Sequence, residues 1–118
     1  MPPQTISIIT ACFRSEATIR DALESVNCQT YPAIDHVIID GASNDRTIDI
    51  VKECGKRVVH ITSEPDRGIF DAYNKGLAAA KGEICGILNS DDFYASPRVI
   101  EHVMGVFEDP LIEAVYAD

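Results

Sequence analysis

The stretch TISIITA at Thr5–Ala11 consists almost entirely of β-branched and apolar residues. A strand covered on both faces of a sheet needs such a run, whereas a strand with one wet face alternates apolar and polar residues. Further segments of this kind follow at intervals along the chain. The predicted strands are Thr5–Ala11, Ile34–Asp40, Arg57–Thr62, Glu83–Asn89 and Ile112–Ala117.

Amphipathic segments separate these strands and predict helices. The predicted helices cover Glu16–Cys28, a segment from Ser43 or Asn44 to about Cys54, Ile69–Lys81, and a segment from Ser96-Pro97 to about Glu108. Ser15, and Ser43 or Asn44, are the predicted N-caps. Repeated βα units with short connections predict an α/β fold, with a doubly wound, mostly parallel, Rossmann-like sheet in three α/β/α layers.

Composition limits the size and the class of the protein. The chain has 118 residues, 46% of them hydrophobic, which suits one domain with a real core. The formal net charge is −9, and residues 60–118 carry eleven acidic and four basic side chains. Nucleic-acid binding needs clustered positive charge, so that class is excluded. A phosphate ligand would meet repulsion in this acidic half unless a divalent cation intervened.

The cysteines and the N-terminus bear on the cellular location. The four cysteines, Cys12, Cys28, Cys54 and Cys85, form no CxxC pair, which excludes a zinc ribbon and a thioredoxin-like site. Each lies among apolar neighbours, and we expect buried free thiols. No signal peptide begins the sequence, and no apolar run is long enough to span a membrane. We therefore expect a soluble, cytoplasmic protein.

Carboxylates lie at the carboxyl ends of three of the first four predicted strands, in Asp40–Thr47, Ser63–Gly68 and Asn89–Asp92. In doubly wound sheets the ligand lies beyond the carboxyl ends of the strands, where the strand order reverses. Asp91 and Asp92 come directly after an apolar strand, and a bound Mg²⁺ or Mn²⁺ would relieve their mutual repulsion. The alternative is a solvated turn. Asp40 ends another strand before Gly41, and it serves either a ligand or the backbone of its own turn.

Other polar residues near the strand ends have simpler interpretations. We expect Ser43 and Asp45 to act mainly as a cap and a first-turn acid of the following helix. Lys75 is expected to be solvated, and Arg67 to pair with Glu64 or Asp66 in its loop. The sequence contains neither GxGxxG nor GxxxxGK[ST], which excludes the dinucleotide and P-loop fingerprints.

Four motifs in order resemble the nucleotide-sugar half of family 2 glycosyltransferases, which have the GT-A fold. They are Ile8-Ile9-Thr10-Ala11-Cys12-Phe13, the DGxSxDxT pattern at Asp40–Thr47, the segment Glu64–Gly76, and Leu88-Asn89-Ser90-Asp91-Asp92, an xDD version of the DXD motif. The resemblance covers nearly the whole chain.

The resemblance implies a role for several residues in holding a nucleotide. Thr10 and Phe13 would line the base pocket, and Asp40 would bond to the edge of uracil or another base. Asp66 would lie in the loop that flanks the nucleotide. The family more often has Tyr and Asn where this chain has Phe13 and Arg14, and Phe keeps the stacking surface without the hydroxyl.

The same resemblance implies the metal site and the reaction. Asp91 would lie by the ribose and the metal-bound diphosphate, and Asp92 would ligate the Mg²⁺ or Mn²⁺. The expected enzyme transfers sugar with inversion from a nucleotide-diphosphate sugar, most readily a UDP-sugar, to an unknown acceptor. Catalytic domains of the family are about twice this length. We therefore interpret residues 1–118 as a truncated donor-binding half, inactive by itself, whose catalytic base is unknown.

The sequence leaves two alternatives to a glycosyltransferase. A non-catalytic nucleotide-sugar binding module would fit the short length. A receiver-type signalling domain fits poorly, because its acids after strand one and its lysine after strand five are missing.

In the GT-A pattern a strand after residue 118 pairs beside Glu83–Asn89. Without it, that apolar edge is a template for pairing with a second copy, which predicts a homo-oligomer.

Overall fold

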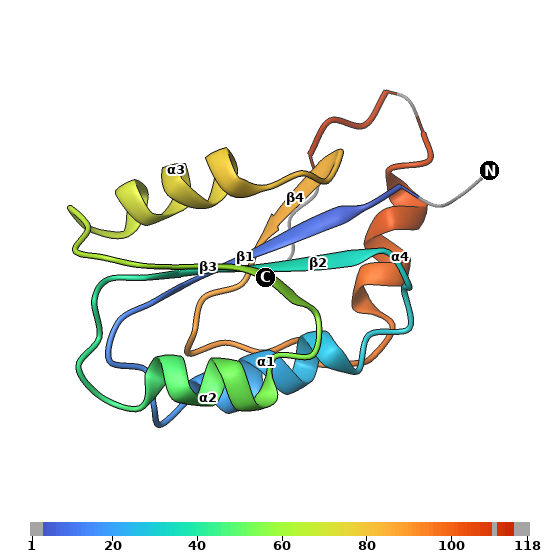
Figure 1. Ribbon diagram of the computed structural model, residues 1–118. Coiled ribbons are helices and arrows are strands. Elements are labelled where there is room, and N and C mark those ends of the chain that lie inside the picture. The colour runs from blue at the N-terminus through green and yellow to red at the C-terminus, as the bar shows by residue number, and fades with distance from the viewer. Residues whose placement is uncertain (1–3, 110, 115–118) are drawn as a thin grey trace.

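A computed structural model describes residues 4–109 and 111–114 of the chain. Strands and helices alternate, as Figure 1 shows. The strands are β1 (Ile6–Cys12), β2 (Ile34–Asp40), β3 (Val58–Ser63) and β4 (Ile84–Ile87). The helices are α1 (Ile19–Asn27), α2 (Thr47–Cys54), α3 (Ile69–Ala79) and α4 (Val99–Val106).

The four strands form one parallel sheet in the order β3-β2-β1-β4. The chain first moves outward from β1 to β3 and then crosses back to place β4 on the other side of β1. This is the doubly wound topology predicted from the sequence, and the strand order reverses between β1 and β4. A receiver-type order of 2-1-3-4-5 would put β3 beside β1, so the topology excludes that alternative.

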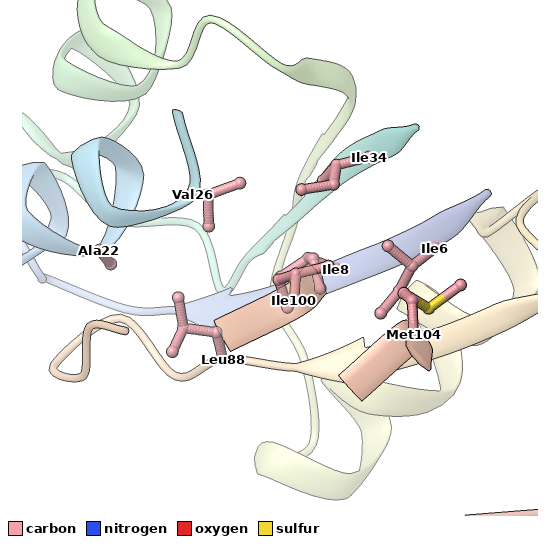
Figure 2. Packing of buried hydrophobic residues seen from close by; sticks show 8 residues of the cluster. All are labelled: Ile6, Ile8, Ala22, Val26, Ile34, Leu88, Ile100 and Met104. Atoms are coloured by element: carbon pink, nitrogen blue, oxygen red, sulfur yellow. The ribbon is translucent and has the colours of Figure 1, made fainter. Parts of the chain in front are cut away.

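Helices cover both faces of the sheet and give the three predicted layers. In Figure 1, α3 lies above the sheet, α1 and α2 lie below it, and α4 stands at the right-hand end of the strands. The packing of α4 with α1 in one core cluster assigns it to the lower layer. All seven residues of β1 are buried, as the apolar run at its centre requires. The core below the sheet joins α1 and α4 to the strands (Figure 2), through Ile6, Ile8, Ala22, Val26, Ile34, Leu88, Ile100 and Met104.

The upper layer packs closely because α3 has a glycine facing the sheet. A Cβ atom added at Gly76 would lie 2.4 Å from Cγ2 of Ile9 in β1. Ala72, one turn earlier, is also buried against this face, in a cluster with Ile9, Val37 and Ile39. Small residues on α3 thus let the helix axis approach β1 and bring the start of α3 close to the ends of the strands.

The bounds of the first four predicted strands are confirmed to within two residues, the largest difference being the end of β4 at Ile87 in place of Asn89. Helix α3 begins at Ile69 as predicted, whereas the other three begin later: α1 starts at Ile19, α2 at Thr47 and α4 at Val99. The prediction of Ser15, and of Ser43 or Asn44, as N-caps was wrong, because the N-cap positions are Thr18 and Arg46, and neither side chain makes a capping bond. In the predicted fifth strand, residues 112–114 belong to no strand, and residues 115–117 lie outside the described residues.

The expectation that all four cysteines are buried was only partly correct. Cys12 is buried and Cys54 is half-buried, whereas Cys28 and Cys85 are exposed. Cys28 ends α1, and Cys85 lies on an edge strand, so neither position is covered by a neighbouring element. None of the helices in the described part of the chain combines the length and the apolar character that a bilayer-crossing segment requires.

Candidate functional site

A cleft of about 630 Å³ opens where β1 and β4 end, at the reversal of strand order. Small-molecule sites typically measure about 300–1,000 Å³ and favour this position in doubly wound sheets. Three residues predicted from the sequence line it, namely Phe13, Asp66 and Asp91. The remaining lining residues are Ala11, Cys12, Arg14, Ser15, Ala17, Thr18, Gly68, Ile69, Ala72, Asn89 and Ser90.

The loop after β1 presents an aromatic ring and a cation to this cleft. The Phe13 side chain is 55% exposed. Arg14 has a positive φ of 50°, which is uncommon for a residue with a side chain. Its backbone N–H donates to Oγ of Ser43 at 2.7 Å, and this bond holds the loop in that conformation. The guanidinium carbon of Arg14 lies 4.9 Å from the centroid of the Phe13 ring, within cation–π range.

Asp40 lies beneath this loop with its carboxylate fully buried. Its oxygens accept bonds from the backbone N–H and hydroxyl of Ser43, from the hydroxyl of Ser63 at 2.7 Å, and from the thiol of Cys12 at 3.6 Å. Burial, followed by the charge of Asp40, raises the pKa of the Cys12 thiol, which therefore stays a donor. Asp40 joins the ends of β1, β2 and β3 and does not line the cleft. Its contact with a base stays a prediction.

Thr10 also lies away from the cleft. It is fully buried, and its Oγ1 lies 2.8 Å from Nε2 of His36 on the neighbouring strand. Burial lowers the pKa of His36 to about 4, so the ring is neutral at physiological pH. The structure thus places the Thr10 side chain inside the fold, between β1 and β2, and its part in a base pocket stays a prediction.

Hydrogen bonds made by the hydroxyl groups of Thr47, Ser15 and Ser90 connect the loops on either side of the cleft. The hydroxyl of Thr47 donates to Asp45 at 2.6 Å and accepts the backbone N–H of Ser15 at 2.8 Å. The bond from Thr47 lowers the pKa of the Asp45 carboxyl. The hydroxyl of Ser15 in turn lies 2.7 Å from that of Ser90, next to Asp91. The residue expected to cap α1 therefore fixes the loop after β4 instead.

Asp66 reaches the cleft from the loop between β3 and α3. One carboxylate oxygen accepts the backbone N–H of Gly68 at 3.1 Å. The other oxygen and the Phe13 ring both flank Gly41, where an added Cβ would lie 3.0 Å from Asp66 Oδ2 and 3.3 Å from Phe13 Cδ1. Gly41 thus lets a carboxylate and an aromatic ring approach the same point of the backbone.

The basic residues of this loop and of α3, Arg67 and Lys75, do not line the cleft. Lys75 was expected to be solvated, but its ammonium pairs with Glu64 at 3.2 Å and with Asp71 at 3.6 Å. The expected pairing of Arg67 with Glu64 or Asp66 does not occur among the ion pairs of the described residues. Instead, the backbone N–H of Arg67 donates to Asp71. These contacts stabilise the loop against the first turns of α3.

Asp91 and Asp92 are both exposed, and only Asp91 lines the cleft. Within residues 4–109 and 111–114, their carboxylates take part in no hydrogen bond or ion pair. Their oxygens therefore suit a hard divalent cation, which prefers carboxylate ligands. In the same part of the chain, no three His, Cys, Asp or Glu side chains come together as a metal-binding group. The two aspartates would hold a cation only together with ligand or water oxygens.

Arg14 and Asn89 line the cleft although the sequence reasoning did not select them. Tyr73 donates its hydroxyl to Oδ1 of Asn89 at 2.8 Å, which leaves the amide N–H groups as free donors. Asn89 stands in the quoted motif and could have been selected from its place at a strand end. The position of Arg14 depends on its positive φ, for which an arginine in the sequence gives no signal.

Comparison with known proteins identifies relatives over most of the chain. A family model described as Glycosyl transferase family 2 matches residues 7–117. An uncharacterised glycosyltransferase of Mycobacterium tuberculosis is 35% identical over 81% of this chain and 37% of its own length. The Escherichia coli enzyme WfaP, a UDP-Glc:α-D-GlcNAc-diphosphoundecaprenol β-1,3-glucosyltransferase, is 32% identical over 85% of this chain and 40% of its own length. The chain thus spans well under half of these relatives.

Solved structures show the same fold. The mannosyltransferase PcManGT from Pyrobaculum calidifontis, in complex with GDP-Man and Mn²⁺, superposes with a TM-score of 0.86 at 22% identity, over 94% of this chain and 34% of that one. S. aureus TarS, in complex with UDP-GlcNAc, superposes with a TM-score of 0.82 at 23% identity, over 89% of this chain and 31% of that one. These two similarities establish the fold.

Proposed function

Because this chain belongs to glycosyl transferase family 2, we propose that it forms the donor-binding part of an enzyme that transfers sugar from a nucleotide-diphosphate sugar. The observation that carries the proposal is the cleft at the ends of β1 and β4. An exposed aromatic ring, Phe13, and the carboxylates of Asp66 and Asp91 meet there, at the switch point of a doubly wound sheet.

Each side of the cleft suits a different part of such a ligand. Phe13 offers a ring face on which a base can stack. Thr10 and Asp40 support this side from within the fold: Asp40 holds Ser43, which fixes the loop that carries Phe13. A direct contact of Asp40 with the base edge stays a prediction, since it requires the buried carboxylate to become accessible. Asp66 flanks the nucleotide, and Asp91 lies toward the ribose and the diphosphate. A UDP-sugar is the proposed donor, since WfaP is named for UDP-Glc.

We propose that Asp92 and Asp91 hold a Mg²⁺ or Mn²⁺ ion against the diphosphate. Both carboxylates are exposed and free of bonds to other described residues, so they retain the oxygens that such an ion needs. The ion would neutralise charge on the diphosphate and on the departing nucleotide. Without it, these aspartates would repel the ligand.

The remaining reaction components are proposed to lie outside this chain. Inverting transfer requires a base within hydrogen-bond reach of the acceptor hydroxyl. The cleft carboxylates among the described residues, Asp66 and Asp91, are assigned to the donor side. The acceptor site and the catalytic base would then be formed by residues other than these, and residues 1–118 alone would transfer no sugar. The four free thiols support a reducing, cytoplasmic location.

Calorimetry with nucleoside diphosphates tests this proposal. We expect UDP to bind more tightly with Mn²⁺ than with a chelator, and Asp92→Ala to remove most of that difference, because the ion loses a carboxylate ligand. Asp21→Ala, which removes an exposed carboxylate on α1 outside the cleft, is the matched control and should leave the difference intact. Equal affinity for UDP in chelator and in Mn²⁺ would contradict the metal proposal. No binding of any nucleoside diphosphate would contradict the function.

A further inference from the structure

The hydroxyl of Ser15 joins the loop after β1 to the loop after β4, both of which line the cleft. On the first side it lies 3.3 Å from the backbone nitrogen and 3.3 Å from the carbonyl oxygen of Phe13. On the second side it lies 2.7 Å from the hydroxyl of Ser90, the residue before Asp91. A hydroxyl has one proton to donate and two lone pairs that accept. Bonds from the Phe13 N–H and the Ser90 hydroxyl, together with a bond to the Phe13 carbonyl, would use all three.

Ser15 is itself held firmly by the fold. Only 9% of its surface is exposed, and the same fraction holds for Ser90. The backbone N–H of Ser15 donates to the hydroxyl of Thr47 at 2.8 Å, and Thr47 is fully buried at the start of α2. The bond between the two serines therefore lies out of the solvent, where its loss would leave polar groups unpaired.

The two aspartates that follow Ser90 take their place in the cleft from the backbone alone. The carboxylates of Asp91 and Asp92 form no ion pair with any described residue. Two side chains before them anchor that backbone: Asn89, which accepts the Tyr73 hydroxyl at 2.8 Å, and Ser90. The first anchor attaches the loop to α3, and the second attaches it to the loop after β1.

We propose that Ser15 is a positioning residue that couples nucleotide binding to metal binding, an inference that rests on the proposed function of the cleft. A nucleotide held against the loop after β1 would steady Ser15, and through Ser90 it would also steady the two aspartates. A divalent ion would then meet carboxylates that are already in place, which lowers the ordering cost of its binding. Because such coupling is reciprocal, the ion would strengthen nucleotide binding by the same factor.

The competing role for Ser15 is to shape its own loop and nothing more. In that case, removal of the hydroxyl would weaken nucleotide binding by the same factor with and without the ion. Under coupling, the ratio of these two affinities falls. The distances favour coupling, because the shortest contact of the Ser15 hydroxyl is to Ser90, at 2.7 Å, and its contacts within its own loop measure 3.3 Å.

The test measures the affinity of the protein for UDP with Mn²⁺ and with a chelator, and compares the ratio of the two among variants. Ser15→Ala should lower this ratio by about three- to tenfold, which corresponds to the loss of one hydrogen bond. Ser90→Ala removes the same bond from the other side and should lower the ratio equally. The double variant should lower it no further, because both substitutions break one contact. Ser15→Thr keeps the hydroxyl and should retain most of the ratio.

Ser25→Ala is the matched control, because it removes a hydroxyl that bonds within α1, outside the cleft, and it should leave the ratio unchanged. A Ser15→Ala variant that keeps the ratio, even with weaker binding of UDP, would overturn the inference and leave the proposed function intact. Additive losses in the double variant would overturn it as well. Equal affinity of the unaltered protein for UDP in Mn²⁺ and in chelator would remove the inference together with the metal proposal. Failure to bind any nucleoside diphosphate would overturn the proposed function too.

Discussion

Asp40 illustrates how one buried carboxylate can shape a site without lining it. Its oxygens hold Ser43, Ser63 and Cys12, which lie after or at the ends of three strands. Ser43 in turn fixes the backbone of Arg14. The geometry of the cleft therefore depends on a side chain that has no exposed surface.

Asp40→Asn should destabilise the fold. An amide in place of the carboxylate turns one acceptor into a donor that faces the hydroxyl and N–H donors around it. We expect a loss of about 1–3 kcal/mol in the free energy of unfolding, measured by urea denaturation. Asp35→Asn, on the same strand but only half-buried, is the control and should change little. Unchanged stability in Asp40→Asn would show that these bonds are dispensable and that the carboxylate is available for a base.

His36 should make the fold sensitive to acid. Burial lowers the pKa of this ring to about 4, against 6.5 for the unperturbed side chain. Between these values the unfolded chain binds the proton and the folded chain does not, so stability is lost as the pH falls from 6.5 towards 4. The loss attributable to this ring is about 3 kcal/mol.

The measurement compares the pH dependence of urea unfolding for the protein and for His36→Gln, which cannot take up this proton. The stability difference between the two should shrink as the pH falls. His102→Gln alters an exposed ring and serves as the control. Parallel pH curves for the protein and His36→Gln would rule out a depressed pKa at this site.

Among the candidate residues, those that directly follow the end of a strand could be placed in the cleft from the sequence. Phe13, Asp66 and Asp91 meet at one cleft because parallel strands end at the same edge of the sheet. Thr10 does not reach it, because side chains alternate between the two faces of a strand and Thr10 points into the core below. Arg14 could not be predicted, since its orientation arises from a hydrogen bond to a residue 29 positions away.

At the scale of elements, strands were more predictable than helix starts. Strand positions follow from apolar runs, and β2 begins and ends where its run does. The helix starts were misplaced because Ser15 and Ser43 have the chemistry of N-caps but use it elsewhere. Ser15 bonds to Ser90, 75 positions away, and Ser43 accepts the backbone N–H of Arg14, 29 positions away. Long-range partners of this kind leave no local pattern in the sequence.

The packing of α3 on β1 yields a paired prediction. Gly76→Ala places a methyl group 2.4 Å from Ile9 Cγ2, which forces the helix or the strand to move. We expect a loss of about 1–3 kcal/mol in the free energy of unfolding. At Gly105 in α4 an added Cβ meets nothing within 4 Å, so Gly105→Ala should stabilise by up to about 1 kcal/mol. Equal urea midpoints for the two variants would contradict the close approach of α3.

At the scale of the whole molecule, β4 is an edge of the described sheet and pairs only with β1. Ile87 on this strand is 49% exposed, and an apolar edge with free backbone groups favours pairing with another chain. We therefore propose that residues 1–118 associate through β4. Sedimentation velocity should show a dimer that Ile87→Lys converts to a monomer, while Val59→Lys on the opposite edge strand leaves it intact. A monomer at micromolar concentration would count against this assembly.

The central claim is that a nucleotide-diphosphate sugar binds at the ends of β1 and β4. A crystal structure of the chain with UDP and Mn²⁺ tests it most directly, because the anomalous signal locates the ion independently of the nucleotide. We expect the ion beside Asp91 and Asp92 and the base against Phe13. Nucleotide found instead in the second hollow of the described surface, lined by Tyr31 and Met104 among others, would contradict it. So would an ion bound away from both aspartates.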